Sequence, residues 1–142
     1  MRPATAIAAF SAAFLGAAAL DLIGGLIDLS YLQRYYEAAW PQLTWTRDWT
    51  IVALSATFTI ACIPVALIVF ARVRIARWLA LIAAGYAVIA FAQWAIPAMM
   101  RGEPVAPAFV VRALLMAVAF AFLASPPASR WFARPPRRMA DA

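Results

Sequence analysis

Four long apolar blocks dominate the sequence and constrain its fold more than any other feature. They cover about residues 5–32, 49–71, 78–100 and 108–124. A helix needs about 20 predominantly apolar residues to cross a hydrocarbon core of about 30 Å. Because 67% of the chain is apolar and its mean hydropathy is +0.85, well above soluble domains, the sequence predicts an all-α integral membrane four-helix bundle.

Little sequence lies between the blocks, so we expect one membrane domain over residues 1–142 without a separate soluble domain. Consecutive prolines at Pro126-Pro127 end the fourth block, because they remove backbone donors, and residues 125–142 then form an arginine-rich tail. Ala17-Ala18-Ala19 resembles a signal-peptide cleavage site. Cleavage would leave an odd number of crossings and separate the arginine-rich segments, so the first block is expected to stay as a span.

Arginine placement predicts the orientation of these spans. All 12 basic residues are arginines, and one side of a four-span arrangement would carry Arg2, Arg72, Arg74, Arg77, Arg130, Arg134, Arg137 and Arg138. The other side would carry only Arg34, Arg47 and Arg101, beside three acidic residues. The positive-inside rule therefore predicts that both termini lie in the cytoplasm, and we expect a bacterial inner membrane protein.

The composition argues against several classes of function. The chain has no histidine and one cysteine, Cys62, which excludes imidazole haem or zinc ligands and an intrachain disulfide. No nucleophile, base and oxyanion donor occur together, so we expect neither an enzyme nor a metal or cofactor site. The net charge of +6 indicates contact with lipid headgroups rather than with nucleic acid.

Small residues recur every four positions in the first span. One series runs through Ala12, Gly16, Leu20, Gly24 and Asp28, and a second through Ala13, Ala17, Asp21 and Gly25. Residues four apart share a helix face, and small side chains let another helix approach closely. We therefore expect Ala12, Gly16, Gly24 and Gly25 to lie at helix contacts, with another span or with a second subunit.

Two aspartates lie in the same span, and their expected depths differ. Asp28 lies about one turn below the predicted outer boundary, at the depth expected for Arg112 in the fourth span, so the sequence predicts an Asp28–Arg112 ion pair that closes the bundle. Alternatively, Arg112 extends to the outer headgroups. Asp21 lies about 15 Å below that boundary with no cation at its depth, where a charge is costly. It is either protonated or hydrogen bonded to Ser55, Thr57 or Thr59, or it couples protons or cations to transport.

The segments outside the spans carry two further groups of candidate residues. Residues Tyr35, Tyr36, Trp40, Trp45 and Trp49 gather in the first outer loop, which is typical of an aromatic belt at the headgroups; a ligand cage is the alternative. Residues 33–40 are expected to form a short interfacial segment. The basic residues expected to touch anionic lipid, or an acidic surface on a partner, are Arg72, Arg74, Arg77, Arg130, Arg134, Arg137 and Arg138.

The layout resembles the YdgK-type small inner-membrane proteins of bacteria, a four-span group of unknown function. The resemblance rests on the aromatic outer loop with Pro41, Phe70 before the basic turn, VVRALL over residues 110–115, and Ser129-Arg130 followed by Phe132. The basic turn lacks the family's usual proline, and Pro126-Pro127 replace an aromatic position. The resemblance implies a four-span fold but no activity.

Three functions are compatible with the sequence. The first is a non-enzymatic scaffold or accessory subunit that packs through the first span, in a homo-oligomer or a larger membrane complex. The second is a small proton- or cation-coupled transporter or channel that uses Asp21. The third is a lipid-binding or lipid-handling protein that uses the aromatic loop and the arginine tail.

Overall fold

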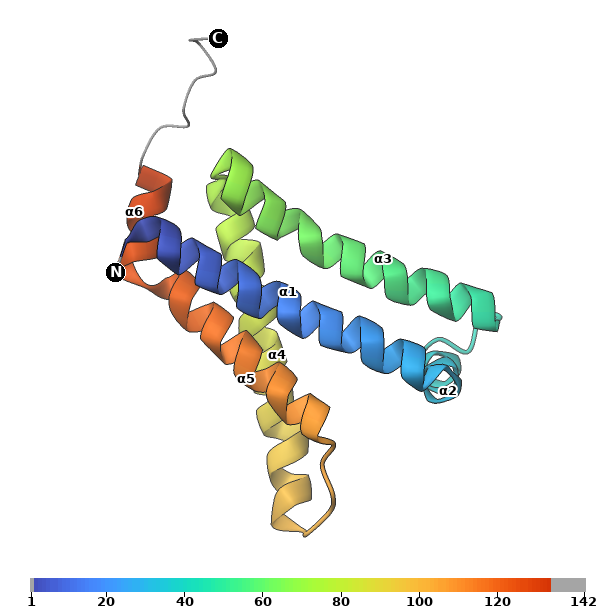
Figure 1. The fold of residues 1–142 in the computed structure, drawn as a ribbon. Coiled ribbons are helices and arrows are strands. Elements are labelled where there is room, and N and C mark those ends of the chain that lie inside the picture. The colour runs from blue at the N-terminus through green and yellow to red at the C-terminus, as the bar shows by residue number, and fades with distance from the viewer. Residues whose placement is uncertain (1, 134–142) are drawn as a thin grey trace.

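The computed structural model describes residues 2–133, and within this range every regular element is helical (Figure 1). The elements are α1 (Pro3–Ile27), α2 (Leu29–Ala39), α3 (Arg47–Ala66), the π-helix η1 (Leu67–Ala71), α4 (Arg74–Met100), α5 (Pro107–Ala124) and α6 (Pro126–Ala133). Four stretches are long and apolar enough to cross a membrane: Pro3–Ile27, Arg47–Ala71, Arg74–Met100 and Pro107–Ala124. The all-helical fold and the four candidate spans expected from the sequence are confirmed.

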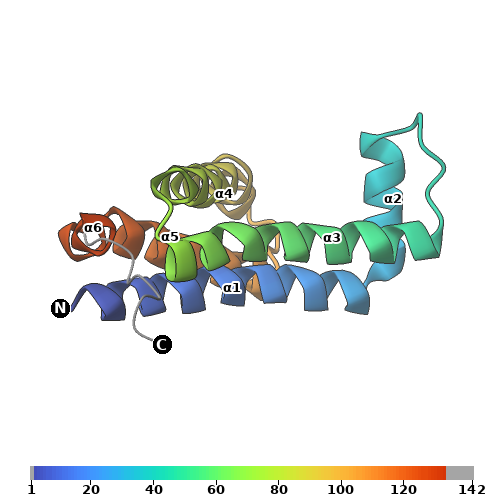
Figure 2. The same cartoon turned by 90° about the horizontal axis from the view of Figure 1, so that it is seen from above.

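The first span ends earlier than expected, because Asp28 interrupts the helix. Its backbone leaves the helical region (φ −117°, ψ 59°), and its carboxylate accepts a hydrogen bond from the Tyr31 backbone N–H at 3.2 Å. Aspartate is among the preferred residues for capping a helix N-terminus in this way. The chain therefore starts a new helix, α2, that runs across the ends of α1 and α3 (Figure 2). The interfacial segment expected over residues 33–40 is part of this longer helix.

The buried core lies at the end of the molecule where the N-terminus, α6 and the turn between η1 and α4 meet (Figure 1). Phe10, Ile68 and Leu123 are fully buried there. Around them are fully buried alanines from four helices, namely Ala6, Ala17, Ala80, Ala119 and Ala128. Small side chains allow the helix backbones to approach closely, and dispersion contacts then hold membrane helices together.

At the opposite end the helices diverge, with α4 and α5 turning away from α1 and α3 (Figures 1 and 2). Much of the apolar surface of the long helices is consequently exposed, including that of Ile27, Ile60, Phe70, Ile82, Tyr86 and Trp94. Exposed apolar surface this extensive is a liability in water but suits helices surrounded by lipid. One half of the molecule is thus a closely packed bundle, and the other half is open.

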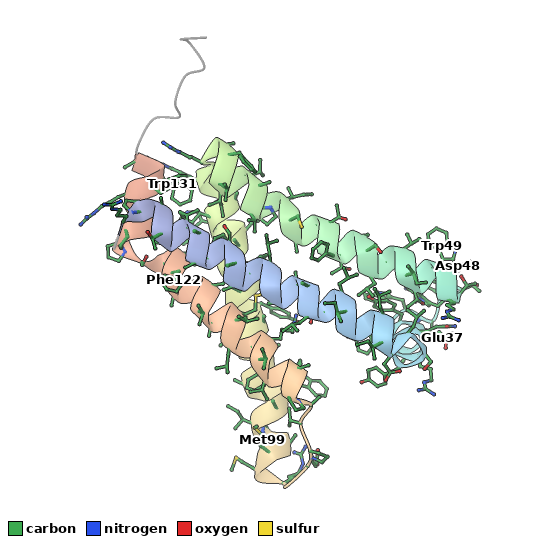
Figure 3. All side chains as sticks on the ribbon, viewed as in Figure 1. Glu37, Asp48, Trp49, Met99, Phe122 and Trp131 are labelled. Atoms are coloured by element: carbon green, nitrogen blue, oxygen red, sulfur yellow. The ribbon has the colours of Figure 1, made fainter. Side chains whose placement is uncertain are left out.

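The turn between α3 and α4 is joined to the C-terminal helix by a tryptophan. After Pro64 the helix widens into η1, and it ends at Arg72, which has a φ of 53°. The backbone N–H groups of Arg72 and Val73 both donate to the Leu67 carbonyl, which leaves the Ile68 carbonyl without its usual backbone donor. The Trp131 indole Nε1 donates to that carbonyl at 3.1 Å, and Figure 3 shows Trp131 where α6 meets this turn.

Helix α6 was not expected from the sequence, which indicated only that the fourth span ends near Ser125. The span does end there, because Ser125 adopts an extended conformation (ψ 151°). The prolines that stop α5 also begin α6, since the first turn of a helix needs no N–H donors. A serine followed by two prolines can start a helix as well as end one. Only the end of a helix was predicted at this position.

Replacing Trp131 by phenylalanine should lower the free energy of unfolding by about 1–2 kcal/mol, because the Ile68 carbonyl loses its donor. The aromatic ring would remain available to Arg72, whose guanidinium carbon lies 4.4 Å from the Trp131 ring centroid. Chemical denaturation in detergent micelles measures the change. Trp78→Phe is the matched control, because Trp78 is exposed on α4 and should change stability by no more than about 0.5 kcal/mol. Equal losses in both variants would contradict the role of the Trp131 hydrogen bond.

Candidate functional site

An ion pair joins α1 to α5, and it involves Asp21 rather than Asp28. The Arg112 Nε of α5 lies 2.7 Å from the Asp21 Oδ2 of α1 and donates a hydrogen bond to it. The expected Asp28–Arg112 pair is therefore wrong, as is the expectation that Asp21 has no cationic partner. Asp28 instead caps α2 and accepts hydrogen bonds from the Tyr31 N–H and the Ser30 hydroxyl.

The early end of α1 explains why depths counted along the sequence misassigned this pair. Asp21 lies six residues before the end of α1 at Ile27, a rise of about 9 Å. Arg112 lies five residues after the start of α5 at Pro107, a rise of about 7.5 Å. The two depths match only when α1 ends at Ile27. The hydroxyls of Thr57 and Thr59 donate to the Ala53 and Ser55 carbonyls one turn back on their own helix, so they do not replace Arg112 as partners.

The ion pair lies in the wall of a groove of about 590 Å³. The groove lies where α4 and α5 diverge from α1 and α3 (Figure 1). Helices α1, α3, α4 and α5 all contribute to it, and its apolar lining includes Phe14, Leu22, Phe58, Pro64, Ala83 and Tyr86. This volume falls within the range of about 300–1,000 Å³ found for small-molecule sites. A mostly apolar cleft with a few polar groups is the arrangement expected of a site for an amphiphile.

Both members of the pair are accessible from the groove. The Asp21 side chain is 42% exposed and that of Arg112 is 29% exposed. Of the Arg112 nitrogens, only Nε bonds to another residue within the described part of the chain. An arginine carries five N–H donors, so the two terminal amino groups of Arg112 keep donors for a bound molecule.

Three of the five loop aromatics form a cluster at the end of the molecule near Asp21. The ring centroids of Tyr36 and Trp45 are 4.7 Å apart, and those of Tyr36 and Trp40 are 5.7 Å apart. The Gln33 amide fixes the loop by donating to the Trp45 carbonyl at 3.0 Å. These three rings therefore pack on one another. A separate pocket of about 440 Å³ is lined by Trp45 and Trp49, so the aromatic cage stays a prediction.

The other two loop aromatics lie outside this cluster. Trp49 is well exposed at the start of α3, and Tyr35 contacts only the edge of the cluster through Tyr36. Burial raises the pKa of the Tyr36 hydroxyl, with smaller increases from Tyr35 and the Asp21 carboxylate, while a hydrogen bond involving Thr57 lowers it. Tyr36 therefore lies within electrostatic range of Asp21.

The predicted packing residues of the first span divide into two groups. A Cβ at Gly16 would lie 3.6 Å from Leu115 of α5, and one at Gly25 would lie 2.8 Å from Leu54 of α3, so both glycines lie at helix contacts. Ala12 is exposed, and a Cβ at Gly24 would meet nothing within 4 Å. Within the described chain a side chain at position 24 would face no other helix, so contact with a second subunit remains as a prediction for these two exposed residues.

The arginines expected to touch lipid are also divided. Arg72 stacks over Trp131, and Arg77 lies 5.5 Å from the Phe132 ring centroid and donates to the Ser129 hydroxyl at 3.0 Å. These two side chains therefore pack on α6, where cation–π contacts contribute to its attachment. Arg74 and Arg130 are exposed and remain available for lipid. Arg134, Arg137 and Arg138 lie outside the described residues.

The chain matches no family model, no curated protein and no solved structure. The resemblance to the YdgK-type proteins therefore stays a prediction.

Proposed function

We propose that this chain is a non-enzymatic integral membrane protein that binds the hydrocarbon chain of a membrane amphiphile between its diverging helices. The single observation that carries the proposal is the groove of about 590 Å³, whose lining is mostly apolar and includes one charged pair, Asp21 and Arg112. Because the groove opens between membrane-length helices, an amphiphile can enter it directly from the surrounding bilayer. This is the lipid-binding function expected from the sequence, placed in the groove instead of the aromatic loop.

The proposed location is the bacterial inner membrane with both termini in the cytoplasm. The arginine distribution supports this orientation by the positive-inside rule. The arrangement of the helices is consistent with it, because the N-terminus, the basic turn before α4 and helix α6 lie together at one end, whereas Glu37, Asp48 and Trp49 lie at the other (Figure 3). In this orientation the exposed Arg74 and Arg130 face the anionic headgroups of the inner leaflet.

Filling the groove should abolish amphiphile binding without unfolding the protein. Ala83 is exposed and lines the groove from α4, so Ala83→Phe would occupy part of its volume. Native mass spectrometry of the purified protein should show at least about a tenfold loss of bound lipid, since a blocked apolar site loses most of its buried area. Ala92→Phe is the matched control, because Ala92 is exposed on the same helix outside the groove lining. Unchanged lipid binding in Ala83→Phe would contradict the proposal.

A scaffold or accessory subunit is the second candidate function, and the uncovered outer part of α1 favours it. Ile23, Gly24 and Ile27 are exposed there, and they face no other helix of the described chain. A glycine on such a surface would allow close approach of a helix from a second subunit. The transporter hypothesis stays a prediction too, and its coupling acid, Asp21, now has a basic partner that any transport cycle would have to release.

A further inference from the structure

We propose that the groove selects amphiphiles whose head is uncharged and carries hydrogen-bonding oxygen atoms, such as an ester, an amide or a hydroxyl group. The proposal rests on the proposed function, since it names the head of the molecule whose hydrocarbon chain lies in the groove. It follows from the chemistry of the charged pair in the lining, Asp21 and Arg112, which Thr57 and Tyr86 accompany as the residues with hydroxyl groups.

The ion pair already balances its own charge. With the Arg112 Nε 2.7 Å from the Asp21 Oδ2, a bound anion attracted by Arg112 would also meet the Asp21 carboxylate. A bound cation attracted by Asp21 would likewise meet the guanidinium. Either charged head would also lose its water on entering an apolar groove, and that loss is not recovered against a pair that is already neutralised.

The hydrogen-bonding capacity of the pair is only partly used. The Arg112 terminal amino groups have no partner among the described residues, and the Asp21 Oδ1 also has none. Unpaired polar groups are costly in an apolar environment. An uncharged head can satisfy both partners, because a carbonyl or hydroxyl oxygen accepts from Arg112 while a hydroxyl or amide hydrogen donates to Asp21.

The neighbouring residues give the head a defined place. The apolar lining extends from the pair along α3 and α4 through Phe58, Pro64 and Ala83, which provides room for a hydrocarbon chain. On the other side lies the cluster of Tyr36, Trp40 and Trp45, whose Tyr36 is within electrostatic range of Asp21. An amphiphile whose head meets Asp21 and Arg112 would therefore have its polar end below these rings and its chain directed toward the closed core.

Three probes with an 18-carbon chain that contains one cis double bond, but with different heads, test the proposal. Monoolein is uncharged, oleyl sulfate is anionic and oleylamine is cationic, and native mass spectrometry at pH 7.5 gives the affinity of the purified full-length protein for each. We expect monoolein to bind at least about tenfold more tightly than either ion, the ratio expected for a hydrogen bond to a charged group. Equal affinities, or tighter binding of either ion, would overturn the proposal.

The double variant Asp21→Leu/Arg112→Leu distinguishes head recognition from simple filling of the groove. It removes both charges together and leaves no unpaired charge, so the fold should persist, which thermal unfolding in the same detergent verifies. We expect the preference for monoolein to fall to less than about twofold, while all three probes still bind. A preference that survives in this variant would refute the role of the pair.

The proposed function and this inference fail in different ways. If Ala83→Phe leaves monoolein binding unchanged, the hydrocarbon chain of the probe does not lie in the groove and both proposals are wrong. If Ala83→Phe abolishes binding of all three probes but the wild-type protein does not discriminate among them, the groove binds hydrocarbon and only the inference about the head is overturned.

Discussion

Replacing Asp21 alone by leucine is expected to lower the free energy of unfolding by about 3 kcal/mol, because Arg112 would keep its charge within the membrane without a partner. Arg112→Leu should lower the free energy of unfolding by a similar amount, because it would leave the Asp21 carboxylate without a partner. The double variant Asp21→Leu/Arg112→Leu should recover most of the loss, since it removes both charges and adds apolar surface. Reversible unfolding of the four proteins in mixed micelles gives the coupling energy as a double-mutant cycle.

Asp28 provides the control for this cycle, because it is the acid that counting along the sequence would pair with Arg112. In the structure it only caps α2, so Asp28→Leu should cost about 1 kcal/mol, the usual value of an N-cap. Its effect should add to that of Arg112→Leu without coupling. Coupling of Arg112 to Asp28 instead of Asp21 would show that the ion pair described here is wrong.

The spans could be predicted from the sequence because membrane-length hydrophobic blocks leave few alternatives. Three of the four ran close to the expected limits, and the exception was the first, where apolar residues continue to Leu32 but the helix ends at Ile27. Hydropathy does not register that break, because it depends on one side chain capping a new helix. An error of about one turn at that boundary was enough to assign Arg112 to the wrong aspartate.

The groove could not be predicted from the sequence because it depends on the angles between helices. The lining residues Phe58, Ala83 and Tyr86 resemble the lipid-facing residues around them in composition. Helix crossing angles follow from how side chains of different size interlock at each contact, and here fully buried alanines bring the helices together at one end only. The small-residue series did indicate a close contact of α1, but it could not say which of its glycines would face a neighbour.

Gly24 and Gly25 are adjacent in the sequence but differ in their surroundings, which gives a sharp test of packing in α1. A Cβ at Gly25 would lie 2.8 Å from one Leu54 methyl carbon and 3.0 Å from the other, so the Leu54 side chain would have to shift to make room. Leu54 is also buried. Gly25→Val should therefore lower the free energy of unfolding by about 1–3 kcal/mol, the usual cost of overpacking.

Gly24→Val makes the same chemical change one residue earlier, where a Cβ would meet nothing within 4 Å. It should leave the free energy of unfolding of the monomer within about 0.5 kcal/mol of wild type. Measuring both variants at low and high protein concentration separates packing within the chain from packing between chains, because only the latter makes stability depend on concentration. If Gly24→Val destabilises the protein at high concentration alone, the exposed face of α1 is a subunit contact. If it costs as much as Gly25→Val at every concentration, the placement of Gly24 on an open surface is wrong.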